Sequence, residues 1–187
     1  MADTEREQRM RDLVHLVADP VRSYLHRRTD PATADDVLGD TLLVCWRRLE
    51  EVPHDALPWA IVVARQCLSN ARRADRRRTR LIGRIIAIDP PAASDDSPEA
   101  SSLDASTADA RVTTALAGLR RDDAEILRLW AWDELSSPQI AVVLGISANA
   151  AAIRLHRAKA RLKRELLKSD RLTGHVSHEE GSTDERR

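Results

Sequence analysis

The strongest local signal in the chain lies in residues 136–162, where the sequence reads SSPQIAVVLGISANAAAIRLHRAKARL. Ser136 and Gln139, with a proline between them, predict a capping box at the start of a helix. Gly145 can adopt the left-handed conformation that a tight turn between two helices needs, and Ser147 can cap the second helix. The stretch therefore predicts a helix-turn-helix.

The second helix of this motif has an apolar and a polar face. Its apolar stripe comprises Ala151, Leu155, Ala158 and Leu162. The opposite face carries amide, guanidinium and imidazole groups, which suit base edges and phosphates in a DNA major groove. We predict duplex contacts by Ser147, Asn149, Ile153, Arg154, His156 and Arg157. An ordinary helical hairpin with an arginine-rich exterior remains the alternative, because such patterns also occur by chance.

Helical periodicity also fills the region before this motif. We expect a helix over residues 5–29 that is interrupted near Pro20, followed by a turn at Pro31. Thr33 is the expected N-cap of the next helix, which should end near Pro53. The apolar face of that helix comprises Leu38, Leu42, Cys45 and Leu49.

A third helix should begin with Pro58 at its first position and run into a cluster of arginines. One face of it comprises Trp59, Val62, Val63, Gln66, Cys67 and Asn70. For Trp59 we favour a core position over stacking on a base. Two short helices should precede the helix-turn-helix, with apolar positions at Val112, Leu116, Leu119, Ile126, Leu127 and Trp130.

Composition agrees with a helical fold. Aromatic residues make up 3% of the 187 residues and phenylalanine is absent, so Leu, Val, Ile and Ala must build the core. We predict an all-α protein of two small helical domains, residues 5–87 and 110–168. A flexible acidic linker, residues 88–109, should join them, and residues 169–187 should form a disordered tail.

The formal net charge of zero conceals a strong segregation of charge. Residues 59–87 carry a net charge of plus seven and residues 145–168 plus six, whereas residues 88–110 carry minus six. Two separate basic blocks indicate two contacts with a polyanion such as nucleic acid. For either block alone, a solvated arginine-rich helix face is an equal alternative.

Several functional classes are disfavoured. Cys45 and Cys67 lack CxxC spacing, which argues against disulfides and a zinc site and for buried thiols in a reducing compartment. No apolar run approaches the roughly 20 residues of a membrane span, and the N-terminal residues are charged, so we expect a cytoplasmic protein with no membrane contact.

We expect no enzymatic activity, cofactor or metal. No Ser-His-Asp set and no glycine-rich phosphate loop is visible. A metal-dependent enzyme is the rival, prompted by His175, His178, Glu179 and Glu180. Ligands in an unfolded tail would lack the surrounding hydrogen bonds that position a metal.

Two motifs in order resemble those of the extracytoplasmic-function sigma factors of bacterial RNA polymerase. The first is ADDVLGDTLLVCW at residues 34–46, followed by WAIVVARQ at residues 59–66. The second is LSSPQIAVVLGIS at residues 135–147, followed by RLHRAK at residues 154–159. The resemblance covers roughly residues 10–84 and 110–166.

The resemblance implies a role for each surface. The acidic helix would dock on the clamp of the polymerase through Asp36, Asp40 and Leu43, although capping and solubility also explain its acids. The next helix would read the minus-ten element as a single strand through Gln66 and Asn70, with the loop of residues 52–57 closing a pocket around a flipped base. Its backbone contacts would come from Arg65, Arg72, Arg73 and Arg76.

The helix-turn-helix would hold the minus-thirty-five element as duplex. Further implied partners are the polymerase flap and an anti-sigma factor, and the acidic linker would thread a basic polymerase channel. The chain departs from the family pattern at Gly39, Gln66, Arg120 and residues 150–152, where Gln, Asn, Pro and more polar residues are usual. A stand-alone regulator that binds duplex DNA is the alternative, but it explains only the C-terminal half.

Overall fold

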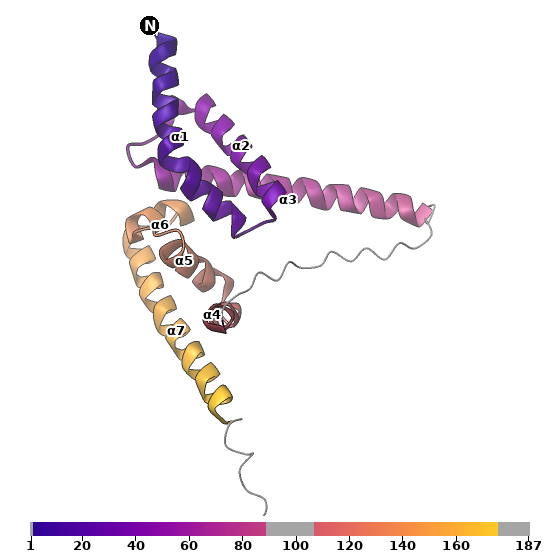
Figure 1. Cartoon of the computed structure of the whole chain (residues 1–187), viewed down its shortest axis with the longest axis vertical. Helices are drawn as coiled ribbons and strands as arrows, with labels where there is room; N and C mark the ends of the chain where they lie inside the picture. The colour runs from indigo at the N-terminus through magenta and orange to yellow at the C-terminus, as the bar shows by residue number, and fades with distance from the viewer. Residues whose placement is uncertain (1, 89–106, 176–187) are drawn as a thin grey trace, which may run out of the picture.

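The computed structural model describes residues 2–88 and 107–175, and every regular element in these ranges is helical (Figure 1). The elements are α1 (Ala2–His26), α2 (Pro31–Arg47), the 3₁₀ turn η1 (Leu49–Glu51), α3 (Ala56–Ile88), α4 (Thr107–Ala117), α5 (Arg121–Ala131), α6 (Ser137–Leu144) and α7 (Ala148–His175). The predicted all-α fold with a helix-turn-helix in its second part is confirmed for these residues.

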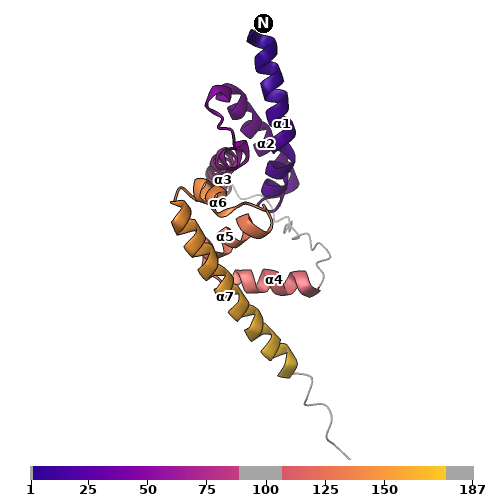
Figure 2. The same cartoon turned by 90° about the vertical axis from the view of Figure 1, so that its left-hand side faces the viewer.

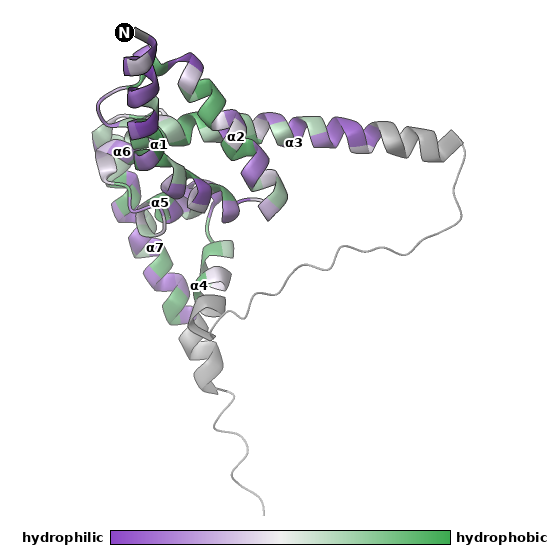
Figure 3. Ribbon diagram, turned by 45° about the horizontal axis from the view of Figure 1, so that its top comes forward, coloured by the Kyte–Doolittle hydropathy of each residue, from purple (hydrophilic) through white to green (hydrophobic). Residues whose placement is uncertain are grey.

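The first half of the protein is a bundle of α1, α2 and α3, which pack against one another in pairs. Its core contains Val17, Val21, Leu25, Val37, Leu38, Cys45, Ile61 and Leu68. Ala60 and Ala64 are also buried, and their small side chains allow close approach of the neighbouring helices. Figure 3 shows α3 changing from hydrophobic at the bundle to hydrophilic in its arginine-rich part. Only the first part of α3 therefore belongs to the core.

The predicted interruption of the first helix is wrong, because α1 continues through Pro20. Val17 and Val21, on either side of this proline, are fully buried, whereas Pro20 itself is exposed. Proline removes one helical hydrogen bond and bends a helix. Burial of each of the two valines contributes about 1.5–3 kcal/mol, and this offsets much of the free-energy cost of a proline inside the helix. Figure 1 shows that α1 changes direction along its length.

The predicted N-cap of α2 is also wrong. Asp30 caps this helix, and its Oδ1 accepts a hydrogen bond from the Thr33 N–H at 2.9 Å. Pro31 occupies the first helical position, where its missing N–H has no cost. The hydrogen bond from the Thr33 N–H lowers the pKa of the Asp30 carboxyl.

Two helix boundaries differ from those predicted. The second helix ends at Arg47 and the turn η1 follows, so it stops before Pro53. The third helix begins at Ala56, which makes Pro58 its third residue instead of its first. Proline fits there as well, because N–H groups in the first turn of a helix have no intrahelical partner.

The second half comprises α4, α5, α6 and α7, packed around Leu116, Ile126, Leu129, Ile140 and Leu155. The predicted inward position of Trp130 is wrong: Leu129 is fully buried, whereas Trp130 is exposed. The Nζ of Lys159 lies 3.4 Å from the centroid of the Trp130 ring, and this cation–π contact holds the indole at the surface. Helix α7 continues to His175, so the first residues assigned to a disordered tail are helical.

The predicted helix-turn-helix is confirmed in detail. Ser136 and Gln139 form the capping box, with the Ser136 N–H donating to Gln139 Oε1 at 2.9 Å. Gly145 has a φ of 65°, which is the left-handed region. The hydroxyl oxygen of Ser147 accepts from the Ala150 N–H at 3.2 Å, and α6 and α7 meet at a bend of 104°.

No single helix in the described ranges is long and apolar enough to cross a membrane. Helix α6 together with the adjoining part of α7 reaches that length and composition only as a bent pair.

Cys45 should resist alkylation until the first half unfolds. It is buried, and burial raises the pKa of its thiol to about 11. At about pH 8, where an ordinary thiol is partly ionised, Cys45 is therefore protonated and also shielded. In a Cys67→Ser variant, mass spectrometry should show iodoacetamide modification at the unfolding rate, and rapid modification in concentrated urea is the control. Rapid modification of the native protein would contradict this arrangement.

Candidate functional site

Helix α2 presents the three residues predicted to contact a partner protein on one exposed face. Asp36, Asp40 and Leu43 are spaced by four and three residues, and all three are exposed. Gly39 lies between the two aspartates, and a Cβ there would meet no atom within 4 Å. The structure thus places these side chains together, on an acidic surface with one apolar residue, where a partner could reach them.

The residues predicted to bind the minus-ten strand divide into two groups. Arg65, Arg72, Arg73 and Arg76 all line one large cleft of about 1300 Å³. Gln66 and Asn70 are exposed but do not line this cleft. The Oδ1 of Asn70 accepts a hydrogen bond from Arg73. The expected backbone contacts therefore lie together along the cleft, and the expected base contacts lie beside them, next to Arg73.

The loop of residues 52–57 was expected to close a pocket around a base. Val52 and Leu57 are partly buried against the core, and Asp55 accepts a hydrogen bond from Gln139 Nε2 at 3.1 Å. Within the described ranges, no hydrogen bond joins this loop to Gln66 or Asn70.

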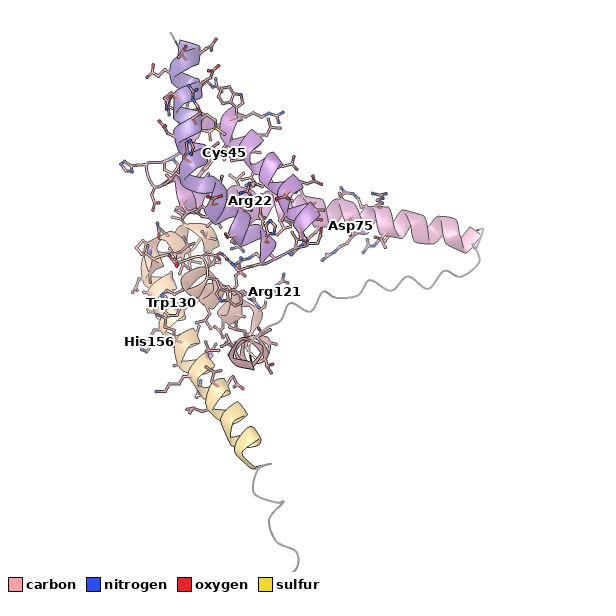
Figure 4. All side chains as sticks on the ribbon, viewed as in Figure 1. Arg22, Cys45, Asp75, Arg121, Trp130 and His156 are labelled. Atoms are coloured by element: carbon pink, nitrogen blue, oxygen red, sulfur yellow. The ribbon has the colours of Figure 1, made fainter. Side chains whose placement is uncertain are left out.

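The polar surface of α7 has two facets. At about 100° per residue, Asn149, Ile153 and His156 lie on one side of the exposed stripe, and Arg154 and Arg157 lie on the other. The two arginines line the cleft. All five side chains are exposed, and Figure 4 shows His156 on the outer side of α7. Ser147, the sixth predicted residue, serves as the N-cap of this helix.

Sequence reasoning missed several residues of the cleft. Its other lining residues include Tyr24, Arg27, Arg28, Arg120, Arg121, Arg128 and Trp132. Burial raises the pKa of Tyr24 to about 12, and the Arg28 guanidinium lies 3.7 Å from the centroid of its ring. The arginine doublets were visible in the sequence, but no spacing rule connects residues so far apart.

Ion pairs and hydrogen bonds hold the two halves against each other, with α6 packed on α3 (Figure 2). Asp133 has a side chain only 2% exposed and accepts from Arg27 and, at 3.1 Å, from Arg28. The Nη1 of Arg65 donates to the carbonyl oxygen of Val143 at 3.4 Å. Arg65 therefore contributes to the contact between the halves as well as to the cleft.

Known proteins are similar to this chain over both of its halves. Residues 109–162 match the family described as Sigma-70, region 4. The ECF RNA polymerase sigma factor SigL of Mycobacterium tuberculosis is 30% identical over 145 residues, which cover 76% of this chain and 79% of SigL.

A second relative is the probable RNA polymerase sigma factor RfaY of Xanthomonas campestris pv. campestris, 30% identical over 141 residues. That match covers 74% of this chain but only 35% of RfaY, so the chain spans about a third of that relative. Among solved structures, the sigma factor RpoE in complex with the anti-sigma factor NepR from Bartonella quintana is 22% identical. The match has a TM-score of 0.52 and covers 91% of this chain and 99% of RpoE, which shows a shared fold.

Proposed function

The chain belongs to the extracytoplasmic-function sigma factors of RNA polymerase, and from this premise we propose that it binds core polymerase and reads a promoter at two separate sites. One site is a single-stranded minus-ten element and the other is a duplex minus-thirty-five element. The observation that carries the proposal is the helix-turn-helix, in which Gly145 turns the chain so that the polar stripe of α7 faces outward. The chain selects the start site, and the polymerase synthesises the RNA.

Docking on the polymerase is assigned to the acidic face of α2. The carboxylates of Asp36 and Asp40 would meet a basic surface of the clamp, and Leu43 would add apolar contact. Complementary charge raises association rates and excludes wrong partners, which suits a subunit that competes for one enzyme. The exposure of all three side chains supports this assignment.

The minus-ten element is assigned to α3. Gln66 and Asn70 would hydrogen-bond to an unstacked base, while Arg72, Arg73 and Arg76 hold phosphates. Because unpaired bases would bind better than paired ones, binding itself shifts the duplex towards melting. No catalytic group on this chain is required for strand opening.

The minus-thirty-five element is assigned to α7. Asn149, Ile153 and His156 would face base edges in the major groove, and Arg154 and Arg157 would hold the flanking phosphates. Residues 150–152 are all alanine, so few side chains remain for direct readout. Contacts with phosphates should therefore supply a large share of the affinity.

Binding both elements requires the halves to separate. The two elements lie roughly 25 base pairs apart, a distance of about 85 Å along the duplex. In the structure, arginines of both sets line one cleft, in which Arg73 and Arg157 are both found. We therefore assign the structure to the free chain, and the promoter-bound form would be open. An anti-sigma factor that holds the halves together would favour the closed form. The polymerase flap is the proposed partner of the second half. Most of the predicted acidic linker, residues 89–106, lies outside the described residues, whereas residues 107–109, also assigned to it, are helical and belong to α4.

A charge-reversal variant tests docking on the polymerase. Asp40→Lys should weaken binding to core polymerase at least tenfold, because facing like charges cost several kcal/mol and each 1.4 kcal/mol is about tenfold. Fluorescence anisotropy of the labelled chain with core polymerase measures this. Asp12→Lys, which reverses an exposed acid on α1, is the control and should bind normally. Equal affinities for both variants would contradict the assignment.

Transcription assays test the function as a whole. With core polymerase, the chain should direct run-off transcription from start sites that core polymerase alone does not use. In a mobility-shift assay, the chain should bind DNA fragments that carry these start sites only when core polymerase is present. Tight binding of the chain alone to promoter duplex, without any start-site selection, would favour the stand-alone regulator instead.

A further inference from the structure

The cleft between the two halves is far more basic than the chain as a whole. Twelve arginines and three carboxylates line its volume of about 1300 Å³, an excess of nine positive charges. The chain has a net charge of zero, so this concentration is a product of the fold. A cleft lined by charge of one sign focuses the field and attracts ligands of the opposite charge.

The arginines converge from elements that are distant in sequence. Arg73 and Arg76 come from α3, Arg121 from the start of α5, and Arg157 from α7. Figure 4 shows Arg121 between α4 and the first half. Within the described part of the chain, Arg76, Arg121 and Arg157 have no acidic partner. These guanidinium groups are therefore available to an anion from outside.

The volume of the cleft, about 1300 Å³, favours a chain of phosphates over a duplex. One turn of B-DNA is about 34 Å long, which exceeds what a cleft of this volume can enclose. A single isolated phosphate would leave most of the arginines without a partner. A few linked phosphates, spread along the cleft, would satisfy groups on all three elements.

An exposed tryptophan identifies the phosphate chain as nucleic acid. Trp132 lines the cleft and is 40% exposed, with the Arg128 guanidinium 5.9 Å from the centroid of its ring. Proteins that bind single strands combine a basic groove with aromatic rings on which bases stack. Trp130, two residues earlier, is equally exposed but does not line the cleft, and its ring is already in contact with Lys159.

We propose that the free chain, in its closed arrangement, binds a short single strand of nucleic acid in this cleft without core polymerase. Arg76, Arg121 and Arg157 hold the phosphates, and a base stacks on Trp132. A strand in the cleft occupies arginines that promoter binding would use, and it contacts both halves at once. Binding the closed form alone, it opposes separation of the halves and so delays their use on a promoter.

Fluorescence anisotropy with the full chain tests the proposal. The probe is a labelled strand of about ten nucleotides, DNA in one arm and RNA in the other. If three or four phosphates are engaged, the logarithm of affinity should fall with the logarithm of salt with a slope of about −2 to −3. Trp132→Ala should weaken binding about fivefold or more. Trp130→Ala should bind like the unaltered chain.

Two further comparisons distinguish binding of the strand in the cleft from binding by general surface charge. The pair Arg73→Ala and Arg76→Ala should weaken binding more than the pair Arg77→Ala and Arg78→Ala, which removes equal charge from exposed residues outside the cleft. Asp133→Asn makes the chain more positive yet should weaken binding, because it releases the contact between the halves. Circular dichroism confirms that each variant remains helical.

The proposal is overturned if Asp133→Asn tightens binding, if both arginine pairs weaken it equally, or if Trp132→Ala has no effect. Each result would mean that the strand is held by diffuse charge alone. Run-off transcription with core polymerase does not depend on these outcomes, so the proposed promoter function would stand.

Discussion

Asp133→Asn is expected to separate the two halves of the chain and to raise its radius of gyration in solution. The Asp133 side chain is 2% exposed and that of Arg28 is 10% exposed, so their ion pair is shielded from water. Neutralising Asp133 removes one of the two acidic partners of Arg28, the other being Glu125 at 3.5 Å, and breaking such a buried pair costs about 3–5 kcal/mol. At about 1.4 kcal/mol for each factor of ten, the closed arrangement should lose at least a hundredfold in population relative to the open one. Small-angle X-ray scattering measures the change.

The control for this variant is Asp123→Asn. Asp123 is also a mostly buried acid, and it pairs with Arg161 inside the second half. Its loss should destabilise α5 against α7 without separating the halves, so the radius of gyration should change little. Scattering curves that are the same for Asp133→Asn and the unaltered chain would contradict the role assigned to Asp133.

The same opening should also favour assembly with core polymerase. When only a fraction of a protein is competent to bind, its apparent affinity falls by that fraction. A chain that is already open should therefore bind core polymerase more tightly in the anisotropy assay described for Asp40, and it should bind a short single strand less tightly. These opposite changes from one substitution would be hard to explain by charge alone.

Ile140→Ala is expected to unfold the second half while leaving the first half folded. Ile140 lies on α6, and its side chain is fully buried. Truncation of a buried isoleucine to alanine costs about 2–5 kcal/mol, which is a large fraction of the stability of so small a unit. Thermal unfolding followed by circular dichroism should show an early loss of part of the helical signal. Hydrogen exchange should then locate that loss in α4 to α7.

Val142→Ala is the matched control for this variant, since Val142 lies on the same helix but is 53% exposed. Its effect should stay within about 0.5 kcal/mol. A single unfolding transition for Ile140→Ala, shifted as a whole, would show that the two halves unfold together. That outcome would contradict the independence of the second half.

Local sequence patterns predicted the helix-turn-helix well, because its determinants are short-range. The capping box needs only Ser136 and Gln139, and the turn needs only a residue such as Gly145 that tolerates a positive φ. The same reasoning failed where two local solutions compete. Asp30 and Thr33 are both good caps, and Asp30 prevails because Pro31 follows it. Leu129 and Trp130 are both apolar, and the packing of α5 on α7 determined which one is buried.

By itself, the sequence determined the all-α class, the helix-turn-helix and the exposed acidic face of α2, because periodicity and capping operate within a few residues. Tertiary structure alone determined the arginine-lined cleft and the burial of Asp133. Arg28 and Asp133 are separated by 105 residues, and no local pattern indicates that they meet. An amphipathic pattern specifies that a helix face will be covered but not which element covers it, so the contact between the halves depends on the docking of the folded bundles.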